Sequence, residues 1–330
     1  MFSRTHRNAA GLAVVLAVVC VLPFVLRPYQ LDFLIFMFIN IILVVSYRLI
    51  AITGEFSLAH AVIMGVGAYA SALLAALPIS PWISMPLGGV AAAAIAYILS
   101  FPLFRMKGFY FLIGSFAAAE AIRLCWVQFN DPFGGFRGLR RIPVLEIDLG
   151  ELLYIDLGAP VPYYFFAMIV GTICLTVMYR IENSRFGFIF HGVHHKDTLA
   201  QSVGVDVRRY RTIAFVTGGF FAGIAGAMIA HYVTAINPGL FGLKQMLFVL
   251  VWVLVGGMGH FAGPIVGVTV LSIIDESLRG LDELRPGFYG LVLIATILFL
   301  PEGLVSLPRK FLEWMTWLRN RAGAGLAKRE

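Results

Sequence analysis

The sequence has little charge for its length. Charged residues make up only 13% of the 330 residues, whereas a soluble domain carries about 25%. Hydrophobic residues make up 60%, and the mean hydropathy is +0.87. A soluble fold of this size could not hide so much apolar surface, because a large part of any such fold stays in contact with water. The composition therefore excludes an ordinary soluble domain, a disordered chain and collagen, and it indicates a polytopic membrane protein.

Cysteine is also scarce. The chain has three cysteines, Cys20, Cys125 and Cys174, which is an odd number. Each lies in an apolar run without C-x-x-C spacing. This pattern excludes a disulfide scaffold. It predicts small buried hydrophobic side chains and no redox or metal role.

Apolar runs bounded by charges, proline or glycine predict an all-α transmembrane helix bundle. We expect about ten spans within one membrane domain that covers residues 1–330. The predicted spans are 9–27, 31–52, 56–77, 84–104, 108–130, 162–180, 212–234, 244–261, 263–281 and 287–304. No A-x-A site follows the first run, so we interpret it as an uncleaved span. Glycine-rich stretches at 54–67 and 256–264 predict one or two broken or re-entrant helices.

The net charge of +7 fits this layout. If residues 1–8 are cytoplasmic, ten spans return the basic tail 305–330 to the same side. Most of the 25 Lys and Arg residues then lie on that side, as the positive-inside rule requires. Residues 131–161 become a long outer loop, and 181–211 a long cytoplasmic loop. The charge thus indicates membrane orientation and not nucleic-acid binding.

Motifs for catalysis are absent apart from one histidine cluster. There is no G-x-x-x-x-G-K-[ST] phosphate loop, G-x-S-x-G, H-E-x-x-H or dinucleotide fingerprint. His191, His194 and His195 form an H-x-x-H-H pattern that is typical of membrane di-iron enzymes. Such a site needs more histidines than the seven in this chain. We therefore expect no enzyme, no metal and no ATP site here, and basic surface histidines instead.

A few ionisable residues lie inside the predicted spans. Glu120 and Arg123 share one helix face through their i, i+3 spacing. Neither should face lipid, where a bare charge costs at least about 2.5–3.5 kcal/mol. They form either a mutual pair inside the bundle or a polar contact along a substrate pathway. Arg48 can snorkel to the inner interface, and Asp275 and Glu276 have structural roles.

Two sets of residues resemble a known family. Residues 54–61 (GEFSLAHA) and 65–69 (GVGAY) resemble a G-x-x-S-L-G-H-A…G-x-G-A-Y segment. The second set comprises Asn183–Gly187, Val203–Val207, Arg209-Tyr210, Ala214-Phe215, 222–227 (AGIAGA), 256–259 (GGMG) and Gly263-Pro264. In order and spacing these residues resemble branched-chain amino acid ABC transporter permeases of the LivM type, over roughly residues 30–305.

The resemblance implies a permease subunit of an ATP-driven importer in the prokaryotic cytoplasmic membrane, with both termini cytoplasmic. The implied partners are a second related permease, two cytoplasmic ATPase subunits that bind ATP and Mg²⁺, and an outer solute-binding protein. The implied solutes are branched-chain or other small neutral amino acids, with urea, short amides or sugars also possible among relatives. The alternative is a secondary transporter or channel that uses Glu120 and Arg123 and needs no ATPase.

The inner loop contains a short helix signal. Asp197 is a predicted N-cap for Thr198–Val203, and Gly204 is the predicted C′ residue. Ala200-x-x-x-Gly204 resembles the coupling motif of ABC importers, which implies a helix that docks on the ATPase. The predicted coupling residues are Arg185, Asp197, Ala200, Gly204, Arg208 and Arg209. The alternative is a basic loop that faces lipid headgroups.

Glycines also mark the candidate substrate path. Gly256 and Gly257 break an apolar run, and irregular backbone at membrane depth needs protein or water around it. Ser57 and His60 lie at a glycine-rich helix start and serve either the path or local packing and capping. The path candidates are Ser57, His60, Glu120, Arg123, Gly256 and Gly257. Gly223 and Gly226 predict a close helix contact. Relative to the family pattern, Glu55 is an added charge.

Overall fold

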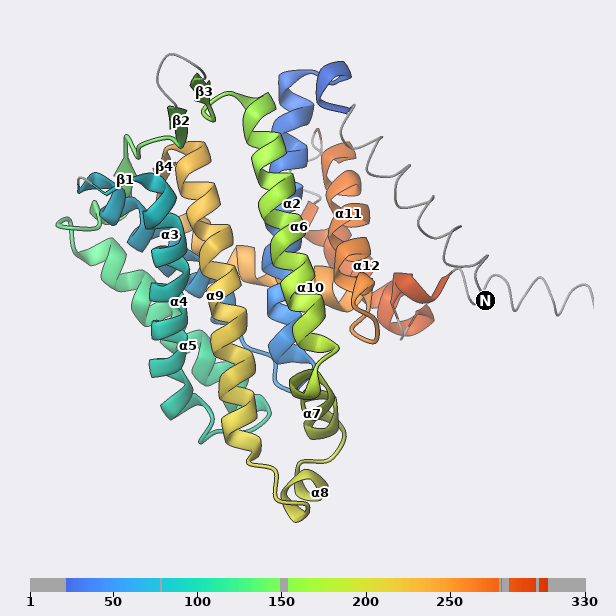
Figure 1. Ribbon diagram of the computed structural model, residues 1–330. Helices are drawn as coiled ribbons and strands as arrows, with labels where there is room; N and C mark the ends of the chain where they lie inside the picture. Colours follow the sequence, from blue (N-terminus) through green and yellow to red (C-terminus); the bar gives the residue numbers. More distant parts are fainter. Residues whose placement is uncertain are drawn as a thin grey trace, which may run out of the picture.

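Long apolar helices run side by side through the molecule (Figure 1). The computed structural model describes residues 22–77, 79–148, 154–278, 280, 285–300 and 303–307. The main helices are α2 (Pro28–Ala51), α3 (His60–Ala76), α4 (Pro81–Leu103), α5 (Phe109–Gln128), α6 (Pro160–Glu182), α7 (Arg185–His195), α8 (Asp197–Ser202), α9 (Val207–Val233), α10 (Leu243–Gly256), α11 (Ala262–Ser277) and α12 (Arg285–Phe299). Short 3₁₀ turns are η1 (Gly135–Arg137), η3 (Pro238–Phe241) and η5 (Leu304–Ser306).

Within the described ranges, six helical segments are long and apolar enough to cross a membrane. They are Pro28–Ala51, Pro81–Leu103, Phe109–Gln128, Pro160–Glu182, Val207–Val233 and Pro238–Gly256, and His60–Ala76 and Gly287–Thr296 are shorter apolar helices. The predicted polytopic bundle is confirmed. The count of ten stays a prediction, because most of the predicted span 9–27 lies outside the described residues.

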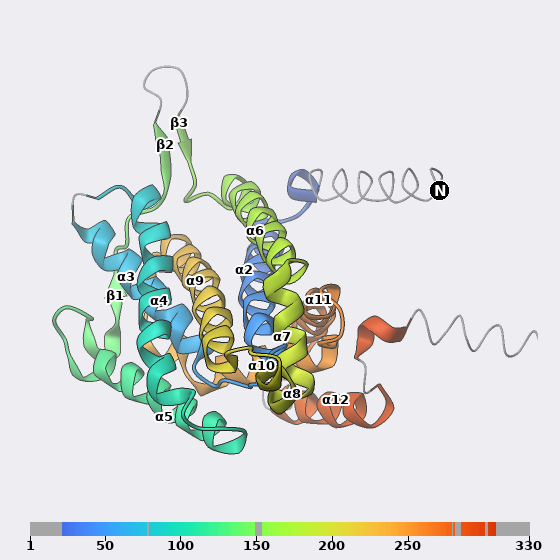
Figure 2. The same ribbon diagram turned by 60° about the horizontal axis from the view of Figure 1, so that its bottom comes forward.

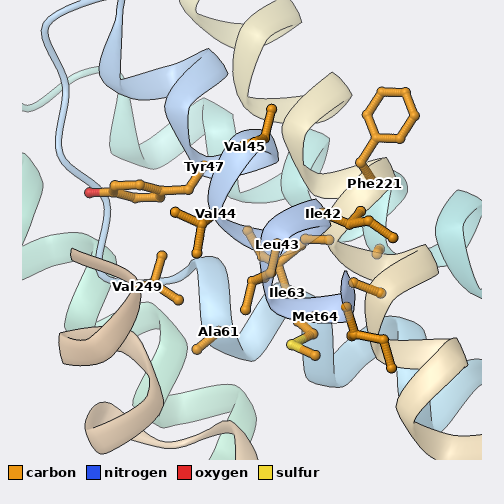
Figure 3. Close-up of a cluster of buried hydrophobic side chains, with 14 of the residues drawn as sticks. Ile42, Leu43, Val44, Val45, Tyr47, Ala61, Ile63, Met64, Phe221 and Val249 are labelled. Atoms are coloured by element: carbon orange, nitrogen blue, oxygen red, sulfur yellow. The ribbon is translucent and has the colours of Figure 1, made fainter. Parts of the chain in front are cut away.

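The centre of the bundle is the packing of α9 against α2, α3 and α4. Figure 3 shows part of it, where Leu43 of α2, Met64 of α3 and Phe221 of α9 gather. Lipid tails are as apolar as leucine, so close van der Waals packing, and not escape from water, drives helix association in a membrane. Small residues permit it here, since a Cβ atom on Gly223 would lie 2.9 Å from the Cα of Gly89. The predicted close contact of α9 is confirmed.

Two breaks interrupt the helices. Residues 257–261 separate α10 from α11, within the predicted break at 256–264. The other break lies at 52–59, and α3 begins at His60, so the predicted break at 54–67 is placed too late and the predicted span 56–77 begins too early. Gly54 and Gly257 have φ of +89° and +99°, a backbone conformation that favours glycine.

The two ends of the bundle differ. At one end β1 (Leu139–Arg140) pairs with β4 (Ala235–Ile236), and β2 (Glu146–Asp148) pairs with β3 (Tyr154–Asp156) in a hairpin that projects from the helices (Figure 2). α7 and α8 lie at the opposite end (Figure 1). α7 was not anticipated within the predicted loop 181–211. It begins because the Ser184 hydroxyl accepts a hydrogen bond from the backbone N–H of Phe186.

Cys174 is buried and Cys125 is exposed, and both are free thiols. The prediction of a buried small hydrophobe is therefore wrong for Cys125. α5 buries few of its residues, so an apolar sequence there does not lead to a buried position. Cys20 lies outside the described residues.

Candidate functional site

Helix α8 ends as its sequence predicts. Gly204 has φ of +85°, its N–H donates to the carbonyl of Gln201 at 3.0 Å, and the N–H of Val205 donates to Ala200 at 3.0 Å. These two bonds are the Schellman pattern that closes a helix at a C′ glycine. The role of Gly204 as C′ residue is confirmed.

The start of α8 does not follow the prediction. Lys196 is the N-cap residue, Asp197 is the first helical residue, and no side chain caps the helix. The Asp197 carboxylate instead accepts a hydrogen bond from Nη2 of Arg211 on α9 at 3.0 Å. The N-cap prediction for Asp197 is wrong because a charge-assisted bond to a guanidinium is stronger than a local bond to a backbone N–H.

Arg211 also forms an ion pair with Glu55 in the 52–59 break, with 3.1 Å between Nη1 and Oε1. Glu55 is 4% exposed and Arg211 is 9% exposed. The pKa of the Glu55 carboxyl lies above its ordinary value, mainly because the carboxyl is buried. The positive charge of Arg211 lowers this pKa, the negative charge of Asp197 raises it, and the positive charge of Lys107 lowers it. Sequence reasoning missed this cluster, although the added charge of Glu55 in an apolar motif was a signal for a buried partner.

The surface around α7 and α8 is apolar with a basic rim. A groove of about 660 Å³ lies between them, lined by Phe188, Ile189, Gly192, Lys196, Leu199, Ala200, Val203 and Val205. Phe188 is 83% exposed and Val203 is 74% exposed. Arg185, Arg208 and Arg209 are exposed, and Arg208 donates to the carbonyl of Phe101 at 3.0 Å. The predicted coupling residues therefore gather at one end of the bundle.

Ser57 and His60 are buried at the start of α3. The Ser57 hydroxyl accepts a hydrogen bond from the N–H of Ala59 at 3.1 Å. Nε2 of His60 lies 2.9 Å from the hydroxyl of Ser46 on α2. His60 therefore lies between α2 and α9, since a Cβ atom on Gly218 of α9 would lie 3.5 Å from its Cε1.

Glu120 and Arg123 form the expected pair on α5, where Nε of Arg123 donates to Oε2 of Glu120 at 2.8 Å. The pair is only partly buried, with side-chain exposures of 32% and 24%. Arg123 also approaches Gly242, just before α10. The pair is therefore accessible from outside this chain, close to the start of α10.

Gly256 is the last residue of α10, and Gly257 is the first residue of the α10–α11 break. A Cβ atom on Gly256 would lie 2.7 Å from the carbonyl carbon of Gly263. Arg48 reaches the same break, and its Nε donates to the carbonyl of Met258 at 3.0 Å. Arg48 is 1% exposed and forms an ion pair with Glu182 at the end of α6. The prediction that Arg48 snorkels to the interface is wrong, because its guanidinium pairs with the Glu182 carboxylate inside the bundle.

Of the histidine cluster, His191 lies near Glu182, with 3.8 Å between Nε2 and Oε1. No group of three or more His, Cys, Asp or Glu side chains that could hold a metal ion is found in the described part of the chain.

The membrane-length helices, the small-residue contacts between them and the two helix breaks define a polytopic membrane protein. The chain belongs to the family described as branched-chain amino acid transport system, permease component, whose family model matches residues 29–300. It is a permease subunit of an ABC importer, a multi-pass protein of the inner membrane and not an enzyme.

Curated relatives agree with this assignment. The chain is 25% identical to the high-affinity branched-chain amino acid transport system permease protein LivM of Escherichia coli, over 97% of this chain and 79% of the relative. It is 24% identical to LivM of Salmonella typhimurium, over 94% and 77%. It is 22% identical to the nucleoside ABC transporter permease NupC of Lactococcus lactis, over 73% and 82%. No solved structure matches the chain.

Proposed function

We propose that this permease imports branched-chain or other small neutral amino acids. The two LivM relatives, which match nearly the whole chain, support this solute class. A nucleoside permease and a xylose permease also match, over less of the chain. The expected partners are a second related permease, an extracytoplasmic solute-binding protein and two subunits that bind ATP and Mg²⁺.

The observation that carries the coupling proposal is the exposed end of α8. Residues 1–330 act as one permease domain, with both termini and the α7–α8 end cytoplasmic. Ala200 and Gly204 are small, and nothing lies within 4 Å of a Cβ on Gly204, so another protein can approach the backbone closely. ATP-driven closure of the ATPase subunits would displace α8 and shift the bundle between outward-open and inward-open states. Arg185, Arg208 and Arg209 favour an acidic partner surface or lipid headgroups around it.

The solute path is proposed to run along α5. A partly exposed Glu120–Arg123 pair is costly against lipid, so this face of α5 meets the second permease or a water-filled passage. Ser57, His60, Gly256 and Gly257 lie at the two helix breaks. We propose that they shape the backbone beside the path and do not touch the solute.

Copurification in mild detergent tests the function. We expect ATPase subunits to associate with the chain, and uptake of leucine into proteoliposomes to require both ATP and the solute-binding protein. The measurements are the subunit composition of the complex and the rate of radiolabelled uptake. Uptake that persists without ATP, with no ATPase subunit bound, would show that the chain is a secondary transporter or channel.

Gly204→Trp tests the coupling surface. The bulky side chain would occupy the open docking face, and a non-glycine residue with positive φ costs only about 1–2 kcal/mol, so the protein should remain in the membrane. We expect ATP-driven uptake to be abolished. Gly287→Trp on α12 is the control for the added side-chain bulk, because nothing lies within 4 Å of a Cβ atom at this exposed position. Unchanged uptake in Gly204→Trp would refute the docking role of α8.

A further inference from the structure

One guanidinium joins two segments that are far apart in the sequence. Arg211 on α9 contacts Asp197 of α8 at 3.0 Å and Glu55 of the 52–59 break at 3.1 Å. The two carboxylates occupy different nitrogens of the same side chain, which the planar fork of arginine permits and the point charge of lysine does not.

The 52–59 break in turn contacts the helices on either side of it. A Cβ atom on Gly54 would lie 3.2 Å from Nδ1 of His194 on α7. The backbone N–H of Leu58 donates to the hydroxyl of Ser115 on α5 at 2.8 Å. A continuous series of contacts therefore runs from α8 through Arg211 and Glu55 to α5, the helix that carries Glu120 and Arg123.

The two carboxylates that contact Arg211 differ in burial. The side chain of Glu55 is 5% exposed and that of Asp197 is 26% exposed. Removing one partner of a buried pair leaves an uncompensated charge, which is strongly unfavourable. Arg211 is therefore held firmly to Glu55, while the more exposed bond to Asp197 ties the short helix α8 to that unit.

We propose that Arg211 is a positioning residue of the transport cycle, which transmits the displacement of α8 to the 52–59 break and to α5. This inference rests on the proposed function, in which α8 receives the movement of the ATPase. Arg211 touches neither solute nor ATP in this proposal. Its loss should separate ATP hydrolysis from uptake and should not stop both together.

The test uses the complete reconstituted transporter and measures ATP hydrolysis and leucine uptake in the same vesicles. For Arg211→Lys and Asp197→Asn we expect at least a tenfold fall in uptake per ATP hydrolysed, with hydrolysis within about twofold of the unmodified complex. Asp197→Glu, which keeps the charge, should restore much of the ratio. Arg105→Ala is the control, since Arg105 is an exposed arginine just before α5.

The outcomes separate the two proposals. An unchanged ratio of uptake to hydrolysis in Asp197→Asn, or an equal fall of both activities in a fully assembled complex, would overturn the role of Arg211. If Arg211→Lys does not reach the membrane, Asp197→Asn tests the same contact. Asp197 is the more exposed of the two carboxylates, so its substitution is less disruptive to folding. Failure of the unmodified chain to bind any ATPase subunit would instead overturn the proposed function.

Discussion

Gly226→Ala is expected to remove the folded protein from the membrane. A Cβ atom at this position would overlap the carbonyl oxygen of Met64 and lie 2.8 Å from its carbonyl carbon. Both atoms belong to the backbone of α3, so no side chain can rotate away, and α3 and α9 would have to separate. The same contact is tight from the other side, because a Cβ on Gly67 would lie 2.6 Å from the carbonyl carbon of Gly223.

The matched control is Gly171→Ala on α6. Its Cβ would meet only the Cδ1 of Ile42, at 3.9 Å, and alanine is about 1 kcal/mol more favourable than glycine within a helix. We expect a normal yield for Gly171→Ala and almost no monodisperse protein for Gly226→Ala, measured by size-exclusion chromatography in detergent. A normal yield and melting temperature for Gly226→Ala would contradict the close contact of α3 and α9.

Arg48→Ala should destabilise the bundle by about 3–5 kcal/mol, the usual cost of breaking a buried ion pair from one side. The substitution leaves Glu182 without its guanidinium, and it removes the donor to the carbonyl of Met258. Since Arg48 contacts both α6 and the α10–α11 break, the loss should be visible as a lower melting temperature in detergent.

A double variant shows whether the pair itself is responsible. Replacing both partners of a buried pair by apolar residues of similar size is often neutral. Arg48→Met combined with Glu182→Met should therefore recover most of the stability lost in Arg48→Ala. If the double variant melts no higher than Arg48→Ala, or if Arg48→Ala melts like the unmodified protein, the stabilising role of the pair is refuted.

Features that depend on local sequence could be predicted. Apolar runs gave the main helices, the glycines at 256–259 gave the α10–α11 break, and Gly204 gave the end of α8. In each case the physical cause lies within a few residues of the chain. The i, i+3 spacing of Glu120 and Arg123 likewise gave their ion pair.

Features that depend on distant partners could not be predicted. Glu182 lies 134 residues from Arg48, and no local pattern brings them together. Asp197 illustrates how a distant partner overrides a local pattern. Its position in the sequence suits an N-cap, but its carboxylate is bound by Arg211, 14 residues away. Residue type indicated that these charges needed partners, and only the packing of α2, α6 and α9 shows which ones.

The glycine corner between α10 and α11 has a mechanical consequence. A Cβ on Gly263 would lie 2.8 Å from the carbonyl carbon of Gly257, and one on Gly267 would lie 2.9 Å from the Cα of Gly256. A Cβ on Gly303, beyond α12, would lie 2.6 Å from the carbonyl oxygen of Gly256. Because backbone packs directly against backbone here, we expect α10 and α11 to move together as one rigid unit. Bending during the proposed transport cycle is then expected outside this corner.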